Sequence, residues 1–233
     1  MTAAVLPAAA VAPGRLGILG GTFDPIHHGH LAIAEEAREA LGLERVLFVP
    51  AAEPPHKVGR RIGDAEDRLA MVELAIGGNP AFAVSRVELD RPGPSYSVDT
   101  VAALDAEARG DGRMPDLVFI MSGETLRELP TWRDPQRLLD LCRVAVVPRG
   151  GHETPDAVWL GVHFPGREHR FTILSGPLLA VSGSVVRARA AAGRSIRYLL
   201  PDAVARHIGD HALYTGSPDG ATGDHDPRRI PAP

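Results

Sequence analysis

Residues 20–30, with the sequence GGTFDPIHHGH, combine glycine, hydroxyl and imidazole groups in one short stretch. The two glycines at its start carry no side chain, so backbone N–H groups there can approach a ligand closely. Thr22 adds a hydroxyl, and His27 and His30 are spaced so that both can face an anion at the start of a following helix. A metal pair or two solvated histidines are the alternatives, but no cysteine is near enough in the sequence to complete a zinc site. The residue types therefore favour a phosphate-binding site.

The elements around this stretch must hold it as a turn between a strand and a helix. The apolar residues 16–19 predict a short buried strand before it, and the apolar spacing of residues 31–41 predicts a helix that stops at Gly42. Glycine is common just beyond a helix because it adopts a left-handed conformation without strain. In an open α/β sheet, ligands bind beyond the carboxyl ends of the strands, which is where this turn would lie.

Apolar runs alternate with amphipathic segments along most of the chain. Further strands are predicted at residues 45–50, 82–87, 117–121, 144–148 and 171–174, and further helices at 65–76, 97–108, from Asp134-Pro135 onward, 182–193 and 201–208. Residues 150–170 are the least regular part and contain one predicted short helix. This alternation predicts an α/β fold: a Rossmann-like, doubly wound, mainly parallel sheet with helices on both faces.

Composition limits the classes of partner. The 233 residues carry a net charge of −4, and the sequence pI is about 6.2, so no general attraction to nucleic acid or to an anionic membrane is expected. Phosphate binding must therefore come from a local site. The lone Cys142 lies in an apolar run, where it is predicted to be a small buried side chain that forms no internal disulfide, and a cytoplasmic location is expected.

The sequence divides into three predicted parts. Residues 1–14 are rich in Ala, Val and Pro and are predicted to be a disordered N-terminal extension. A signal peptide is not expected there, because Pro7 and Pro13 interrupt the apolar run that such a peptide needs. Residues 15–214 form the predicted nucleotide-handling domain. Residues 215–233, rich in Gly, Pro and Asp, are predicted to be a disordered C-terminal tail. No transmembrane segment is predicted.

Two later segments offer cations and hydroxyls at the same predicted sheet edge. Lys57 follows the second strand, and a flexible ammonium there can reach a triphosphate or a pyrophosphate. Ser182 and Ser184 begin a helix whose first N–H groups can bind an anion, and Arg187 can place two N–H groups on phosphate oxygens. Taken alone, such segments are more often a solvated lysine and an ordinary helix cap.

Together these segments resemble a known family. The stretch GGTFDPIHHGH, the PHK at residues 55–57 and the SGSVVR at residues 182–187 are similar to the signature of the nucleotidyltransferases with an HxGH motif. The GGTFDP version most resembles the bacterial nicotinate-nucleotide adenylyltransferases. PSYSVDT at residues 94–100, and GETL at 123–126 with Trp132 downstream, are similar to the members specific for pyridine mononucleotides. The resemblance covers nearly the whole predicted domain.

The resemblance implies transfer of AMP from ATP to nicotinate mononucleotide, which yields deamido-NAD and pyrophosphate in NAD biosynthesis. It implies the catalytic residues His27, His30, Lys57 and Arg187. The implied ATP-binding residues are Gly20, Gly21, Thr22, Phe23, His27, His30, Gly123, Glu124, Ser182, Ser184 and Arg187. The implied mononucleotide-binding residues are Lys57, Tyr96, Thr100 and Trp132, with the tryptophan stacked on the pyridine ring. No metal-binding residue is implied, because Mg2+ would be held mainly by the ATP phosphates. Protonated histidines would be the strongest hydrogen-bond donors to those phosphates.

Three departures from the family pattern bear on substrate preference. Glu124 stands where the family usually has Asp, Ser97 replaces Thr, and Val185 replaces an acidic residue of many members. Transfer to nicotinamide mononucleotide or phosphopantetheine is an alternative, and so is a non-catalytic nucleotide-binding module. A redox enzyme with a bound dinucleotide would carry Gly-x-Gly-x-x-Gly after the first strand, whereas residues 17–21 are GILGG. Monomer and homodimer both remain open.

Overall fold

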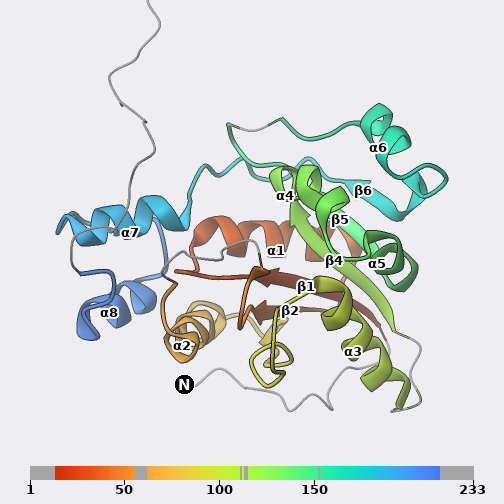
Figure 1. Ribbon diagram of the computed structural model, residues 1–233. Coiled ribbons are helices and arrows are strands. Elements are labelled where there is room, and N and C mark those ends of the chain that lie inside the picture. Colours follow the sequence, from red (N-terminus) through yellow and green to blue (C-terminus); the bar gives the residue numbers. More distant parts are fainter. Residues whose placement is uncertain (1–13, 56–61, 111, 113–114, 152, 216–233) are drawn as a thin grey trace, which may run out of the picture.

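The computed structural model of the protein describes residues 14–55, 62–110, 112, 115–151 and 153–215 (Figure 1). Apart from Gly14 and Thr215, the predicted extensions at the two ends lie outside the described residues, and so does Lys57. Every helix and strand named below lies between Arg15 and Asp210, which is within the domain predicted from the sequence.

Six parallel strands form one sheet in the order β3-β2-β1-β4-β5-β6. The strands are β1 (Arg15–Gly21), β2 (Arg45–Pro50), β3 (Phe82–Val84), β4 (Asp116–Ser122), β5 (Arg143–Val147) and β6 (Phe171–Ile173). The strand order reverses between β1 and its neighbour β4, so a crevice opens between the loops that follow these two strands. The predicted Rossmann-like fold class is confirmed.

Helices cover both faces of the sheet (Figure 1). They are α1 (His28–Leu41), α2 (Ala65–Ile76), α3 (Ser97–Gly110), α4 (Gly123–Glu128), α5 (Pro135–Leu141), α6 (Ala157–His163), α7 (Gly183–Ala191) and α8 (Asp202–Asp210), with the 3-10 helices η2 (Leu129–Thr131) and η3 (Glu168–Arg170). Buried side chains of α1, α2, α7 and α8 belong to the core on one face of the sheet, and those of α3, α4, α5 and α6 belong to the core on the other.

The strands are apolar along nearly their whole length because both faces are covered. In β4, Leu117, Phe119 and Met121 pack into one core, and Val118 and Ile120 pack into the other. The same alternation runs through β2 and β5. A sheet buried on both sides keeps its strand ends rigid, and the loops that follow those ends are therefore held in fixed positions.

Helix ends carry residue types that favour capping positions. Asp64 precedes α2 and accepts a hydrogen bond from the backbone N–H of Glu66 at 2.9 Å. Asp134 caps α5 in the same way, and Pro135 occupies the first helical position. Gly42 ends α1 with a φ of 60°, the left-handed conformation expected there.

Two predicted elements begin or end three residues away from the prediction, and one α-helix was not predicted. The third strand ends at Val84 rather than residue 87, because residues 87–90 form a turn in which the Asp90 N–H donates to the Arg86 carbonyl. Helix α1 begins at His28, three residues earlier than predicted. Helix α4 was not predicted, since six residues are too few to show a helical apolar period. The short helix expected within 150–170 is present as α6.

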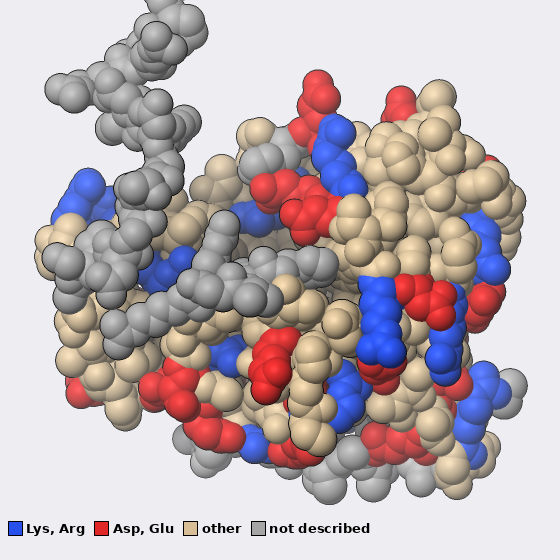
Figure 2. Space-filling view, viewed as in Figure 1, with Lys and Arg blue, Asp and Glu red and all other residues tan. Residues whose placement is uncertain are grey.

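Charges of both signs are interspersed on the molecular face in Figure 2, with no broad basic field. This pattern agrees with the net charge of −4 and with the expectation that anion binding is local. Among the described residues, none of the helices combines the length and the apolar character that crossing a membrane requires.

Candidate active site

A cavity of about 270 Å³ lies at the crevice beyond the carboxyl ends of β1 and β4. Six residues predicted for the site contribute to its walls: Gly20, Gly21, Thr22, His27, His30 and Trp132. The first five come from the first motif, and Trp132 follows η2, more than a hundred residues later. The fold therefore brings the predicted phosphate-binding residues and the predicted ring-binding tryptophan to one cavity.

The two motif histidines form a face-to-face pair. His27 is the N-cap of α1 and His30 lies in its first turn, with ring centroids 3.8 Å apart and ring planes 21° apart. The backbone N–H of His27 donates to Nδ1 of His30 at 3.2 Å. Because Nδ1 of His30 accepts this hydrogen bond, the proton of the neutral ring is carried on Nε2, the nitrogen that can donate to a ligand.

Gly29 and Phe23 support this pair from two sides. A Cβ atom at Gly29 would lie 3.0 Å from both Cε1 and Nδ1 of His27, so only glycine leaves room for the ring. Phe23 has a φ of 50° and a side chain that is almost fully buried, with its ring edge-to-face with His30 at 5.1 Å. The side chain of Phe23 therefore orients His30 and does not line the cavity.

His27, the buried member of the pair, has a lowered pKa. Burial, with the charge of Arg149 as the second cause, lowers the pKa of His27 from 6.5 to about 4. His27 is therefore uncharged at pH 7 in the free protein, and a protonated His27, expected from the sequence, requires an anion in the cavity.

Arg149 is a cavity residue that the sequence analysis missed. It follows β5, and its Nη1 lies 3.4 Å from Oε2 of Glu124, while its Nη2 donates to the carbonyl of Val181. Glu124, predicted to bind ATP, thus pairs with the arginine that lines the cavity. Arg149 comes directly after the apolar run 144–148, so its position at the end of a predicted strand was the available signal.

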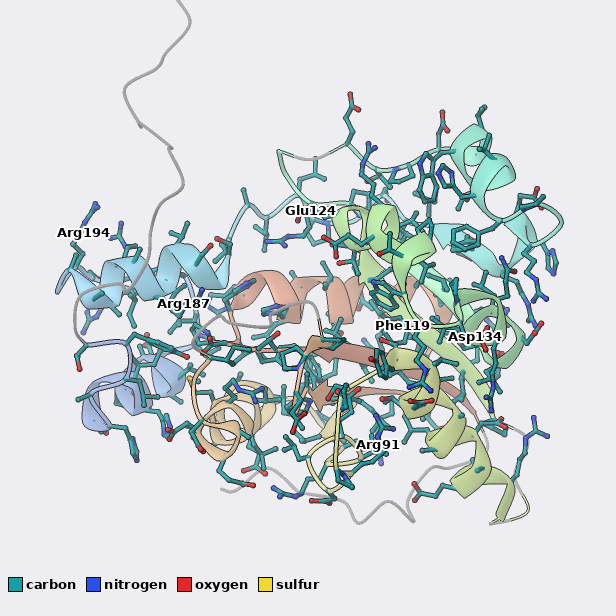
Figure 3. The ribbon with its side chains drawn as sticks, in the orientation of Figure 1. Arg91, Phe119, Glu124, Asp134, Arg187 and Arg194 are labelled. Atoms are coloured by element: carbon teal, nitrogen blue, oxygen red, sulfur yellow. The ribbon has the colours of Figure 1, made fainter. Side chains whose placement is uncertain are left out.

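The start of α7 contacts the loop of the first motif. Ser182 caps α7 by accepting from the Val185 N–H at 3.3 Å, and its hydroxyl lies 3.1 Å from that of Ser184. Arg187 reaches back from α7 and donates to the backbone carbonyl of Asp24 at 2.5 Å, whereas Arg194 lies at the outer end of the helix (Figure 3). These predicted residues are brought next to the first motif, but they do not line the cavity.

Of the residues predicted to bind the mononucleotide, Trp132 lines the cavity, whereas Tyr96 and Thr100 do not. Trp132 packs edge-to-face on Phe119 of β4, with ring centroids 5.9 Å apart. The guanidinium of Arg133 lies over the ring of Tyr96, with Cζ of Arg133 4.7 Å from the centroid of that ring. The hydroxyl of Thr100 is buried and donates to Glu88 at 2.6 Å, so this predicted residue contacts a side chain that lines the cavity.

Glu88 is a second cavity residue that the sequence did not reveal. Its side chain is buried, and burial raises its pKa despite opposing hydrogen bonds from Thr100 and Ser95. The hydroxyl oxygen of Ser95 also accepts from the backbone N–H groups of Ala52 and Glu53, at 3.0 and 3.3 Å. Glu88 lies in a turn without any motif, so only the folded chain shows that it faces the cavity.

Gly123, a further predicted site residue, does not line the cavity. Gly123 is buried beneath Thr154, whose Oγ1 would lie 2.6 Å from a Cβ atom at that position. Lys57 lies outside the described residues, so its predicted role stays a prediction. The first motif and Trp132 thus line one cavity together with Arg149 and Glu88, while the start of α7 contacts the first motif without lining that cavity.

This site at the switch point of a Rossmann-like sheet is that of a nucleotidyltransferase fold, and residues 18–189 match the cytidylyltransferase-like family. Two relatives are each described as a probable nicotinate-nucleotide adenylyltransferase. The protein of Thermomicrobium roseum is 46% identical over 86% of this chain and 91% of its own length, and that of a Roseiflexus species is 48% identical over 85% and 97%. The chain therefore belongs to the nicotinate-nucleotide adenylyltransferase family.

A solved structure shows the same fold. The Plasmodium falciparum nicotinic acid mononucleotide adenylyltransferase complexed with NaAD superposes with a TM-score of 0.71, and the match covers 86% of this chain and 97% of that one. At 16% sequence identity, this likeness supports the fold.

Proposed function

We propose that the protein transfers AMP from ATP to nicotinate mononucleotide, giving deamido-NAD and pyrophosphate for NAD biosynthesis in the cytoplasm. The observation that carries the proposal is the composition of the single cavity described above. One part of the lining offers glycine backbone and imidazoles, which suit a polyphosphate, and another includes the indole ring of Trp132, an aromatic group that suits a pyridine ring. Membership of the adenylyltransferase family supports the same reaction.

The chemistry requires positioning and charge neutralisation. The 5′-phosphate of the mononucleotide attacks the α-phosphorus of ATP in line, the bond to the bridging oxygen breaks, and pyrophosphate leaves with the electron pair. The attacking phosphate is already an anion at pH 7, so the protein needs no general base. Its task is to hold the two phosphates in line and to stabilise the negative charge that spreads in the transition state.

The described residues divide this task. His30 would donate from Nε2 to an oxygen of the α- or β-phosphate, and His27 beside it would do so once the bound anion favours its protonated form. Arg187, from the start of α7, and Lys57 would stabilise the leaving pyrophosphate. Arg149 adds a cation that lines the cavity. Each of these donors acts where charge develops, which is the most effective place for it.

Magnesium would arrive with ATP. Phosphate oxygens and water would supply most of its ligands, because Mg2+ keeps several waters and binds substrate phosphates readily. When bound, the ion neutralises part of the phosphate charge.

The decisive experiment is a pyrophosphate-release assay with ATP and magnesium and a panel of acceptors. Nicotinate mononucleotide, nicotinamide mononucleotide and phosphopantetheine are offered side by side, with ATP alone as the control. We expect the fastest release with nicotinate mononucleotide. Fast release with phosphopantetheine would overturn the proposed acceptor, and ATP binding without release from any acceptor would indicate a nucleotide-binding module.

A further inference from the structure

The first motif contains a buried carboxylate, that of Asp24, which does not line the cavity. Asp24 is 7% exposed, and its Oδ1 accepts from the hydroxyl of Tyr214 at 2.7 Å and from the backbone N–H of Gly63 at 3.3 Å. Its Oδ2 faces Nη1 of Arg187 at 3.7 Å. A carboxylate this deeply buried is stable only when its oxygens are paired, so these contacts define its orientation.

A buried guanidinium completes the network. Arg68 is 1% exposed, and its Nη1 donates to the carbonyls of Thr22 at 2.8 Å and Ala51 at 2.7 Å, the residues that follow β1 and β2. Its Nε donates to the carbonyl of Gly63 at 2.9 Å. Arg68 thus ties two strand ends to the segment whose N–H holds Asp24. The contacts of Asp24 are therefore anchored to the ends of β1 and β2 through Arg68.

Tyr214 provides the contact from the far end of the domain. It follows α8, has a φ of 61°, and is nearly two hundred residues from Asp24 in sequence. Burial, followed by the nearby Asp24 carboxylate, raises the pKa of Tyr214 above its ordinary range. The phenol therefore keeps its proton and remains the donor to Asp24.

We propose that Tyr214 is a positioning residue for nucleotidyl transfer: its hydroxyl fixes the Asp24 carboxylate, which in turn holds the Arg187 guanidinium at the pyrophosphate end of the site. With Oδ1 of Asp24 taken by Tyr214 and Gly63, Oδ2 is directed at Arg187. The carbonyl of Asp24 accepts from the same Nη1 atom, so this nitrogen of Arg187 faces both the backbone and the carboxylate of Asp24. This inference rests on the proposed function through the role given there to Arg187.

The test removes only the hydroxyl. Tyr214→Phe is compared with wild type and with Tyr198→Phe, a matched control because Tyr198 is 84% exposed. The dissociation constant for ATP, measured by calorimetry without an acceptor, should rise about tenfold in Tyr214→Phe and stay unchanged in Tyr198→Phe, on the scale of one hydrogen bond to a charged group. The KM for nicotinate mononucleotide should stay within twofold, because Trp132 and its surroundings are untouched.

A purely structural role for Tyr214 gives a different result. The melting temperature would fall, but ATP affinity per folded molecule would equal that of wild type, and that outcome overturns the proposal. Asp24→Asn is the second variant, since it keeps an acceptor for Tyr214 and loses the charge that faces Arg187. It should weaken ATP binding at least as much, and wild-type ATP affinity in Asp24→Asn would also overturn the proposal.

The two proposals fail in different experiments. ATP binding is measured without an acceptor, so it does not depend on which mononucleotide the protein uses. If no pyrophosphate is released from ATP when nicotinate mononucleotide is the acceptor, while Tyr214→Phe still weakens ATP binding, the proposed acceptor is wrong and the positioning role stands. If release is normal and the variant binds ATP like wild type, the positioning role alone is wrong.

Discussion

His27 and His30 illustrate how a buried residue can be held ready for an anion. Burial and, second to it, the positive charge of Arg149 both disfavour a proton on His27. A polyphosphate in the cavity reverses both effects, because its negative charge favours the protonated ring. The free protein therefore keeps His27 neutral, and a bound ligand would charge it.

The lowered pKa of His27 predicts how stability depends on pH. The unfolded chain binds a proton at this residue near pH 6.5, whereas the folded chain binds it only near pH 4. Stability is therefore complete above pH 6.5 and is lost as the pH falls, by about 3 kcal/mol in the free energy of unfolding. Urea titrations at pH 7.5 and pH 4.5 measure the loss.

The control for this prediction is His27→Gln, which cannot titrate. Other groups lower stability in acid in both proteins, so the difference between wild type and variant isolates His27. The variant should lose less stability than wild type between the two pH values. Equal losses in both proteins would show that His27 is not the group responsible.

His30 predicts an effect on rate. Removing its Nε2 donor by His30→Ala should raise the barrier by about 3 kcal/mol, as for a lost oxyanion donor, which lowers kcat on the order of a hundredfold. The fold should survive, with a loss of about 1 kcal/mol from the missing hydrogen bond of the His27 N–H. The matched control is His163→Ala, since His163 stacks on Trp159 in α6 and does not line the cavity. Near-normal turnover of His30→Ala would refute the role of His30.

At the scale of elements, the site depends on how closely α7 approaches the first motif. A Cβ atom at Gly183 would lie 2.8 Å from the backbone carbonyl oxygen of Asp24. This clash is with backbone, which cannot move aside as the end of a flexible side chain could. Gly183→Ala should therefore move α7 away from the motif and cost about 1–3 kcal/mol of stability, as overpacking does. Because Arg187 moves with α7, ATP affinity should fall as well.

Gly209→Ala is the matched control for that substitution. Gly209 lies within α8, and its added methyl group would meet nothing within 4 Å. Alanine is the better helix former, so this variant should gain about 0.5–1 kcal/mol. Thermal unfolding of both variants and calorimetry with ATP measure the two effects. Destabilisation of the same size in both would contradict the close-contact explanation.

Elements and site residues were predictable where local sequence decides them. Helix α2 begins and ends as predicted because Asp64 caps it and its apolar residues repeat at helical spacing. The first motif was predictable because its residues are consecutive. Glu88 and Arg149 were not assigned to the site, since their place in the cavity depends on the turn after β3 and on the neighbours of β5 in the sheet.

At the scale of the whole molecule, a chain of net charge −4 gathers cations at one point. The strand order places the ends of β1 and β4 on either side of the switch point, and β5 next to β4 brings Arg149 to the same edge. Arg187 arrives from α7 and Tyr214 from beyond α8, so the polyphosphate end of the site draws on nearly the full length of the domain. If the protein binds ATP as proposed, the attraction comes from the arrangement of the folded chain and not from its composition.

This dependence on both ends of the domain predicts the effect of truncation. A chain of residues 14–215 keeps every described contact of the site, and the composition of the removed ends predicts disorder. Its unfolding free energy should stay within about 0.5 kcal/mol of that of the full chain, and its turnover within twofold. Ending the chain at His211 instead removes Leu213, which packs on the core, and Tyr214. That shorter chain should lose ATP affinity at least as strongly as Tyr214→Phe, and a loss of turnover already in the longer one would show that the removed ends contribute to the site.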